Sequence, residues 1–351
     1  MKKNKILAII GARPQFIKHF PMEQACEGQL ILKTIHTGQH YDENMSKVFF
    51  DQLGMRKPDY MLSGGGGNHG EQTGRMMIEI ERIVRDEKPD VVLVYGDTNS
   101  TLAGALVASK LQIPVAHIES GLRSYNREMP EEINRVLTDH ISTWLFTPGQ
   151  QAVENLKKEG IKKGVYEIGD VMKDLVAYVL GKSMFVKPGI EETYVYVTLH
   201  RPYNVDNKER LLEVLKNLNQ LDLKVVFAIH PRTRINAQNF GINLSDFNNI
   251  VFIEPQPYFQ NLGYIYYAEA LITDSGGMQK EAYWMKKRCI TVRKETEWLE
   301  TLKGGANRLI YADLAGLNDC LKAEINEWDE HLYGDGNSCY KIVEILAKNF
   351  E

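Results

Sequence analysis

The sequence has few cysteines, no long apolar segment and no excess of basic residues. Its four cysteines are scattered and form no Cys-x-x-Cys pair, which indicates reduced thiols in a cytoplasm and no metal cluster. No apolar run reaches the length of a membrane span, and the apolar start lacks the cleavage site of a secretory signal. The formal net charge of -4 argues against a general nucleic-acid-binding protein. We therefore expect a cytoplasmic protein with no nucleic-acid partner and no membrane partner.

Sequence motifs for metals and common cofactors are also missing. There is no His-Glu-x-x-His motif and no close spacing of metal ligands, so we predict no metal. The stretch GGGNHG fits Gly-x-Gly-x-x-Gly, but it follows a poor strand and lies outside the first strand-turn-helix unit. It also lacks the Lys-Ser/Thr ending of a P-loop. We interpret it as a mobile loop that covers a ligand, and we predict no cofactor.

Short apolar runs alternate with helical patterns along most of the 351 residues. The first half contains KILAII, VVLVYG, PVAHIE and WLFT, and the second half repeats the pattern with YVYVTLH, KVVFAIH, NIVFIE and ALITDS. Buried strands separated by helices indicate parallel sheets covered on both faces. We predict an α/β protein of two doubly wound, Rossmann-like domains, residues 1–170 and 171–335, facing across a cleft.

In such sheets, ligands bind beyond the carboxyl ends of the strands. After the first strand, the stretch GARPQFIK opens a helix with Arg13 and Lys18 nearby, which favours an anion site; the alternative is a plain turn with solvated cations. His40 follows the next strand, where a histidine is more often a structural hydrogen-bonding group than a catalyst.

Three carboxylates end or begin consecutive elements of the first domain. Asp97 and Glu119 each end a strand, and Glu131 lies in the first turn of the helix after Pro130. Each has an ordinary alternative: a helix cap, a favourable dipole interaction, or an i,i+4 surface pair between Glu131 and Arg135. Three acids at one sheet edge nevertheless suggest acid-base chemistry in a cleft.

The second half carries cationic side chains at its strand ends. His200 and Arg201 follow one strand, and His230 follows the next, which fits recognition of a phosphate chain.

The stretch DSGGMQKEA then places a turn of small residues, Ser275, Gly276 and Gly277, at the start of a helix. Backbone N–H groups there attract phosphate, and Glu281 is placed to accept the hydroxyls of a ribose. We predict a nucleotide site at this turn.

Taken together, these motifs resemble those of the non-hydrolysing UDP-N-acetylglucosamine 2-epimerases, over essentially the whole chain. The segments that carry the resemblance are GARPQFIK, TGQHYDENM, YGDTNSTLAGALVASKLQIPVAHIESGLRS, MPEEINRVLTDH, TLHRPYN, DSGGMQKEA and YGDGNSCYKIVEIL. The resemblance implies the two-domain GT-B fold, with a C-terminal helix at residues 336–351 packing back on the first domain. We also expect a homodimer.

The resemblance also assigns roles to individual residues. The family's catalytic residues fall on Asp97, Glu119, Glu131, His200 and Arg135. We expect the UDP-sugar contacts to fall on Arg13, Lys18, His40, Arg201, His230, Ser275, Gly276, Gly277 and Glu281.

The implied reaction inverts C2 of a UDP-linked 2-acetamido sugar, from UDP-N-acetylglucosamine to UDP-N-acetylmannosamine. UDP is eliminated and added back through a 2-acetamidoglucal intermediate. The reaction serves the synthesis of cell-surface polysaccharide precursors.

The sequence departs from the family's motifs at two places. The chain reads TEWLE at 296–300 where many members read TERPE, a form associated with epimerases of UDP-2,3-diacetamido-2,3-dideoxy-glucuronic acid. Asp42 replaces a glutamine found in members activated by a second substrate molecule, although Gln72 and Arg201 match. A GT-B glycosyltransferase and a hydrolysing epimerase remain as further alternatives.

Overall fold

The computed structural model describes residues 3–39 and 53–349, and it divides the chain into two units. Unit 1 comprises Met1–Tyr178 with His331–Glu351, and unit 2 comprises Val179–Glu330. No helix in the described ranges is both long and apolar enough to cross a membrane.

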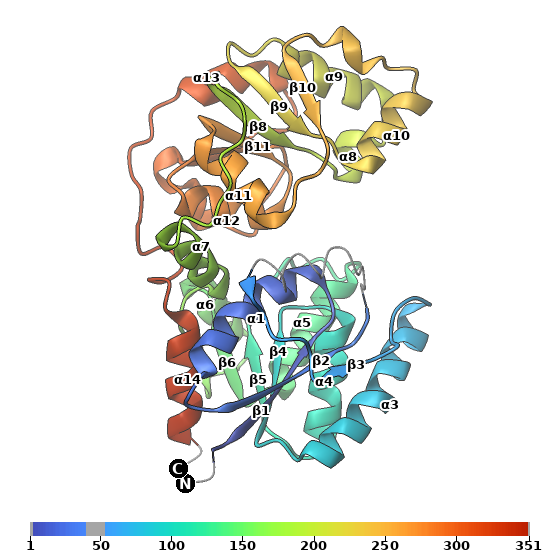
Figure 1. Cartoon of the computed structure of the whole chain (residues 1–351), viewed down its shortest axis with the longest axis vertical. Helices are drawn as coiled ribbons and strands as arrows, with labels where there is room; N and C mark the ends of the chain where they lie inside the picture. The colour runs from blue at the N-terminus through green and yellow to red at the C-terminus, as the bar shows by residue number, and fades with distance from the viewer. Residues whose placement is uncertain (1–2, 40–52, 350–351) are drawn as a thin grey trace. The chain divides into compact units, whose positions relative to one another are not determined.

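Unit 1 is built on a parallel sheet of seven strands in the order β3-β2-β1-β4-β5-β6-β7 (Figure 1). Its strands are β1 (Lys5–Ile10), β2 (Ile31–His36), β3 (Tyr60–Met61), β4 (Val91–Tyr95), β5 (Val115–Ile118), β6 (Trp144–Thr147) and β7 (Val165–Glu167). Its helices are α1 (Arg13–Cys26), α3 (His69–Glu87), α4 (Asn99–Lys110), α5 (Pro130–Ile141), α6 (Gln150–Lys158), α7 (Val171–Gly181, which continues into unit 2) and α14 (Ser338–Asn349). The chain returns to unit 1 at its end, where α14 lies beside α1 (Figure 1).

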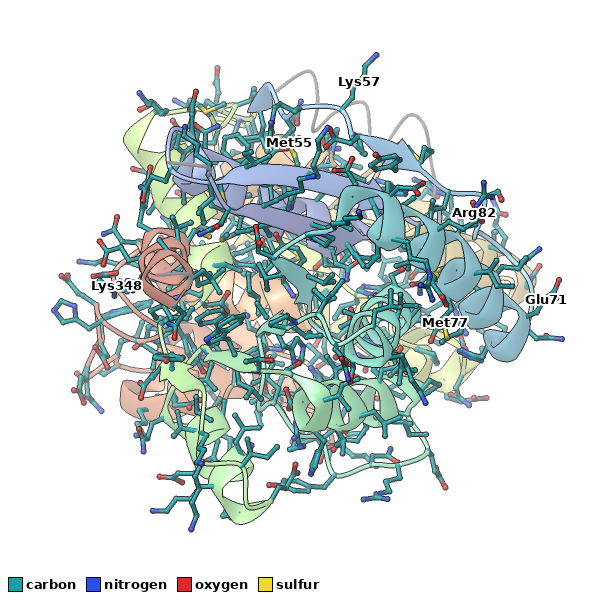
Figure 2. All side chains as sticks on the ribbon, turned by 90° about the horizontal axis from the view of Figure 1, so that it is seen from below. Met55, Lys57, Glu71, Met77, Arg82 and Lys348 are labelled. Carbon is teal, nitrogen blue, oxygen red and sulfur yellow. The ribbon has the colours of Figure 1, made fainter. Side chains whose placement is uncertain are left out.

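The core of unit 1 forms because apolar residues recur at the period of each element. In α3, Met76, Ile80 and Val84 are spaced by one helical turn and are 0–1% exposed. They pack with the side chains of β1 and β4 in one apolar cluster. The opposite side of α3 carries charged side chains such as Glu71 and Arg82, which point away from the sheet (Figure 2).

Unit 2 has a second parallel sheet, of six strands in the order β10-β9-β8-β11-β12-β13. Its strands are β8 (Tyr194–Thr198), β9 (Lys224–Ala228), β10 (Ile250–Ile253), β11 (Ala270–Thr273), β12 (Arg288–Thr291) and β13 (Asn307–Leu309). Its α-helices are α8 (Pro202–Val205), α9 (Lys208–Asn219), α10 (Pro231–Asn239), α11 (Tyr258–Tyr267), α12 (Gly276–Trp284) and α13 (Leu317–Lys322). Short 3-10 helices are η1 (Leu244–Asp246), η2 (Leu299–Gly305) and η3 (Leu314–Gly316).

In each sheet the strand order reverses between two central strands. The reversal lies between β1 and β4 in unit 1 and between β8 and β11 in unit 2. Helices leave in opposite directions at such a point, so the loops beyond it are free to bind a ligand. The segments that follow these four strands are GARPQF, GDTNS, LHRPYN and DSGG, which carry half of the site residues proposed from the sequence.

Candidate active site

Asp97 follows β4 after a sharp turn at Gly96, whose φ is 62°. Two side chains of α5 hold it: Asn134 donates to its backbone carbonyl at 2.9 Å, and the Arg135 guanidinium binds its carboxylate. Burial raises the pKa of Asp97 above its ordinary value, and the charge of Arg135 only partly offsets this. A carboxyl group with a raised pKa is suited to exchanging protons near neutral pH.

Glu119 occupies the corresponding position after β5, in an unusual backbone conformation. Its φ is 67°, a left-handed value that costs energy for a residue with a side chain. Its carboxylate contacts the ammonium of Lys18 from α1, and both side chains are nearly buried. A Cβ added at Gly96 would lie 3.2 Å from Oε2 of Glu119, so the two strand ends meet closely.

Lys18 is therefore a partner of Glu119, held inside unit 1. Burial alone would lower the pKa of Lys18, but the neighbouring charge of Glu119 raises it above the ordinary value. The ammonium stays charged and favours the ionised form of the carboxylate beside it.

The two adjacent glutamates of α5 differ in their surroundings. Glu132 is buried, and its carboxylate accepts hydrogen bonds from the backbone N–H groups of Ser124 (2.9 Å) and Tyr125 (3.0 Å). Glu131 is exposed at the start of the helix. The ion pairs of Arg135 are with Asp97 and with Glu132, so the surface pair with Glu131 considered from helical spacing is not the arrangement observed.

The turn that precedes α1 is organised by a glutamine that sequence reasoning missed. Oε1 of Gln15 accepts hydrogen bonds from the backbone N–H groups of Gly11 (2.7 Å) and Ala12 (3.0 Å). Its amide nitrogen donates to the carbonyl of Tyr95 at 2.8 Å, which links the turn to the end of β4. Two N–H groups expected at an anion site are thus occupied by the protein itself.

Some residues expected at the site lie outside what the structure describes. His40 and Asp42 fall in the undescribed segment, and the side chain of Arg13 is likewise not described. Gln72 is buried in α3, where its carbonyl oxygen accepts a hydrogen bond from the amide of Asn99 at 2.8 Å.

In unit 2, the segments after β8 and β11 are joined by a buried aspartate. Asp274 accepts hydrogen bonds from the backbone N–H groups of His200 (3.0 Å) and Arg201 (2.9 Å). Sequence reasoning gave Asp274 no role, because its partners are distant in the chain. The ring of His200 lies 5.6 Å from that of His230, which caps α10. Burial lowers the pKa of His200, although the nearby charge of Asp274 acts in the opposite direction. The lowered pKa favours a neutral imidazole.

The turn Ser275–Gly277 opens α12, and Glu281 is buried within the same helix at 3% exposure. A Cβ added at Gly276 would meet nothing closer than 3.7 Å, the indole nitrogen of Trp298. Packing within the fold therefore does not require glycine at position 276. Close approach of a ligand to the backbone would require it. The Arg293–Glu297 ion pair lies at the same helix end.

Chemically, the arrangement offers carboxylates that can exchange protons and a helix start that can bind phosphate. Asp97 and Glu119 each contact a cation from another element, so their charges are balanced within unit 1. Across residues 3–39 and 53–349, no group of three or more His, Cys, Asp or Glu side chains is placed to hold a metal ion.

Comparison with known proteins finds that this chain is similar to UDP-sugar 2-epimerases. The family model described as UDP-N-acetylglucosamine 2-epimerase matches residues 24–347. A UDP-N-acetylglucosamine 2-epimerase of Methanocaldococcus jannaschii is 44% identical over 362 residues, covering 98% of this chain and 99% of the relative. A UDP-2,3-diacetamido-2,3-dideoxy-D-glucuronate 2-epimerase of Pseudomonas aeruginosa is also 44% identical, over 356 residues and the same shares of both chains.

A solved structure of the same kind of enzyme also matches this chain. The crystal structure of the Methanocaldococcus jannaschii UDP-GlcNAc 2-epimerase in complex with UDP-GlcNAc and UDP superimposes with a TM-score of 0.84 at 43% identity. The alignment covers 99% of this chain and 100% of that chain.

Proposed function

The chain belongs to the UDP-N-acetylglucosamine 2-epimerase family, with its GT-B fold, and we propose that it converts UDP-N-acetylglucosamine into UDP-N-acetylmannosamine. The product would serve as a precursor of cell-surface polysaccharide. The observation that carries this proposal is the pair of carboxylates, Asp97 and Glu119, that end adjacent strands of unit 1. Each contacts a cation, and the pKa of Asp97 is raised towards the range of proton transfer.

The chemistry explains why a leaving group and several acids are needed together. The C2 hydrogen of the sugar is not next to a carbonyl, so direct removal as a proton would be very slow. If the C1–O bond breaks first, its electron pair leaves with UDP and C1 gains oxocarbenium character. A carboxylate then removes the C2 proton, and the C1=C2 double bond of a 2-acetamidoglucal forms. Return of a proton to the opposite face and of UDP to C1 gives the epimer.

The residues divide these tasks between the two units. In unit 2, the N–H groups at the start of α12 would stabilise the departing diphosphate, and Glu281 would hold the ribose. His200 and Arg201 would contribute to diphosphate recognition. In unit 1, Asp97, Glu119 and Glu131 would move protons at C2.

The tryptophan at position 298 favours an alternative sugar substrate. Trp298, in the segment TEWLE, covers the buried Lys280, whose ammonium lies 3.6 Å from the ring centroid. The indole of Trp298 has one N–H donor and no charge, whereas an arginine there would offer five N–H donors and a positive charge to the sugar oxygens. The relative from Pseudomonas aeruginosa is as similar to this chain as the N-acetylglucosamine enzyme. The alternative substrate is therefore UDP-2,3-diacetamido-2,3-dideoxy-glucuronic acid.

A product assay in D₂O separates these possibilities. The protein is incubated with each UDP-sugar in turn, and the products are identified by NMR and mass spectrometry. We expect a C2 epimer that carries deuterium at C2. Free sugar plus UDP would indicate a hydrolysing enzyme. No turnover of either substrate, or an epimer without label at C2, would contradict the proposed reaction.

The adjacent glutamates of α5 provide a matched pair of variants. Glu131→Gln should lower kcat on the order of 10²-fold and leave thermal stability unchanged, because Glu131 is exposed. Glu132→Gln should lower stability, because its carboxylate accepts two backbone hydrogen bonds. Full activity in a folded Glu131→Gln protein would remove Glu131 from the mechanism.

A further inference from the structure

A buried histidine joins the two strand ends that carry Asp97 and Glu119. His117 lies in β5 and is fully buried. Its Nδ1 lies 2.7 Å from Oδ1 of Asp139, and its Nε2 lies 2.7 Å from the backbone carbonyl oxygen of Gly96. Both ring nitrogens therefore face oxygen acceptors.

The partners fix the number of protons on the ring. A neutral imidazole has one N–H donor and one acceptor nitrogen, whereas an imidazolium donates from both. A backbone carbonyl cannot donate, so Nε2 of His117 must carry a hydrogen. The second nitrogen must carry one as well if Asp139 is ionised.

Asp139 has the surroundings of an ionised carboxylate. Its other oxygen, Oδ2, accepts hydrogen bonds from the backbone N–H of Gly121 (3.0 Å) and from Nη1 of Arg123 (2.7 Å). Two donors on one oxygen, one of them a guanidinium, stabilise the negative charge of a buried carboxylate. With an ionised Asp139 on one side and a carbonyl on the other, both ring nitrogens of His117 face acceptors that cannot donate, so an imidazolium fits this geometry.

The charges around this pair balance within unit 1. Arg123 also forms two hydrogen bonds of 2.7 Å with the carboxylate of Glu159, so cations and carboxylates alternate from His117 to Glu159. The imidazole of His140 lies 3.9 Å from Glu159 at the exposed end of this row. Buried charges persist in proteins when they are paired and hydrogen-bonded in this way.

The pair acts on the two backbone segments that carry the acids. The imidazolium holds the carbonyl of Gly96, directly before Asp97, and the Asp139 carboxylate holds the N–H of Gly121, two residues after Glu119. Both Gly96 and Glu119 have left-handed φ values, 62° and 67°. Glycine adopts such a value freely, whereas Glu119 keeps it only where surrounding contacts enforce it.

We propose that His117, as an imidazolium bound to Asp139, is a positioning residue that sets the distance and orientation of Asp97 relative to Glu119. Its kinetic consequence rests on the proposed epimerase function, whereas its protonation does not. The residue touches no substrate and acts through the backbone on either side of it. Helix α5 contributes to the same arrangement, since Asn134 and Arg135 bind Asp97 from the helix that bears Asp139.

NMR of the intact protein tests the protonation without any substitution. The histidines are labelled with ¹⁵N and observed near pH 8, where a free histidine with a pKa of about 6.5 is neutral. His117 should show a bound hydrogen on each ring nitrogen, both protected from exchange with water. A single N–H on this ring would overturn the proposal. His117→Asn identifies which signal is lost.

Kinetics test the positioning role against a matched control. His117→Asn removes the bond to Gly96 and should lower kcat on the order of 10²-fold, while UDP affinity stays within twofold. His19→Asn removes two comparably buried hydrogen bonds, to the hydroxyl groups of Tyr95 (2.8 Å) and Thr34 (2.9 Å). It should leave kcat within about threefold, since both bonds go to side chains and neither holds the backbone beside Asp97 or Glu119. An unchanged kcat in folded His117→Asn would overturn the proposal. A parent protein inactive on both UDP-sugars would instead refute the proposed function, and the NMR result would still decide the state of His117.

Discussion

Removing the carboxylate of Asp274 should destabilise unit 2 and weaken UDP binding. Asp274 is fully buried directly after β11. It accepts hydrogen bonds from the N–H groups of His200 (3.0 Å) and Arg201 (2.9 Å) and from Nδ2 of Asn204 (3.0 Å). It also lies 3.2 Å from Nδ1 of His200. One side chain thus holds the segment after β8 against the turn that opens α12.

The contacts set the size of the effect. Asp274→Ala removes the shared acceptor of three donors: the buried amide of Asn204, which keeps its bond to the carbonyl of Val292, and the partly buried N–H groups of His200 and Arg201. A buried donor that loses its acceptor costs about 1–3 kcal/mol, and a partly buried one costs less. Entry of water into the vacated space offsets part of this, so we expect a loss of about 3–5 kcal/mol in the free energy of unfolding. Asp274→Asn should lose less, because its amide oxygen can take the place of Oδ2, which receives all three donors.

Asp206 provides a matched control in the same unit. Its carboxylate accepts hydrogen bonds from Nε of Arg232 (2.8 Å) and Nδ2 of Asn236 (2.9 Å), but it is exposed to water. Asp206→Ala should therefore leave the unfolding transition almost unchanged, because water replaces the lost bonds.

The assays are urea denaturation followed by circular dichroism, and calorimetric titration of UDP well below the melting temperature. Folded Asp274→Ala should bind UDP at least about tenfold more weakly, because His200 and Arg201 lose their common anchor. The charge of Asp274 raises the pKa of His200 against the effect of burial, so Asp274→Asn should move that pKa further down. If Asp274→Ala were as stable as Asp206→Ala and bound UDP normally, this account of unit 2 would be wrong.

Four further substitutions test other parts of the molecule. Asp97→Asn and Glu119→Gln should each lower kcat on the order of 10²-fold with UDP affinity intact; near-normal turnover in both would refute their catalytic role. Glu281→Ala should weaken UDP binding roughly tenfold to a hundredfold but scarcely change 2′-deoxy-UDP binding, and calorimetry that finds no discrimination by the parent would exclude the ribose contact. Burial raises the pKa of Glu23 from 4.5 to about 7, so its stabilising contribution is present below pH 4.5 and is lost as the pH rises through 7. Glu23→Gln should therefore gain stability relative to the parent across that window, by at most about 1.4 kcal/mol per pH unit, and parallel urea titrations at pH 5 and 8 that show no change in this difference would contradict it.

The fold could be predicted from the sequence because its determinants are local and periodic. The run KILAII coincides with β1, and its side chains are almost all buried because a parallel strand is covered on both faces. Because ligands bind beyond strand ends in such sheets, the positions of Asp97 and Glu119 predict a site there even when their side-chain contacts are unknown. These inferences needed only the order of apolar and polar residues.

The partners of those acids could not be predicted, because they come from distant parts of the chain. Arg135 is 38 residues from Asp97, and Lys18 is 101 residues from Glu119. Helical spacing suggested Glu131 as the partner of Arg135, but spacing within one helix carries no information about a strand end packed against it. The left-handed φ of Glu119 is equally invisible, since only glycine and asparagine signal such conformations in a sequence.

Two glycines that look alike in the sequence serve different needs in the structure. A Cβ at Gly11 would lie 2.1 Å from Oγ1 of Thr37 and 2.2 Å from Oγ of Ser100, so packing inside unit 1 requires glycine there. A Cβ at Gly276 would meet no atom closer than 3.7 Å. Since a glycine in a helix costs about 0.5–1 kcal/mol relative to alanine, its presence where packing does not demand it needs another cause. The diphosphate that we propose at the start of α12 would supply that cause, because a side chain at position 276 would stand between the phosphate oxygens and the backbone N–H groups.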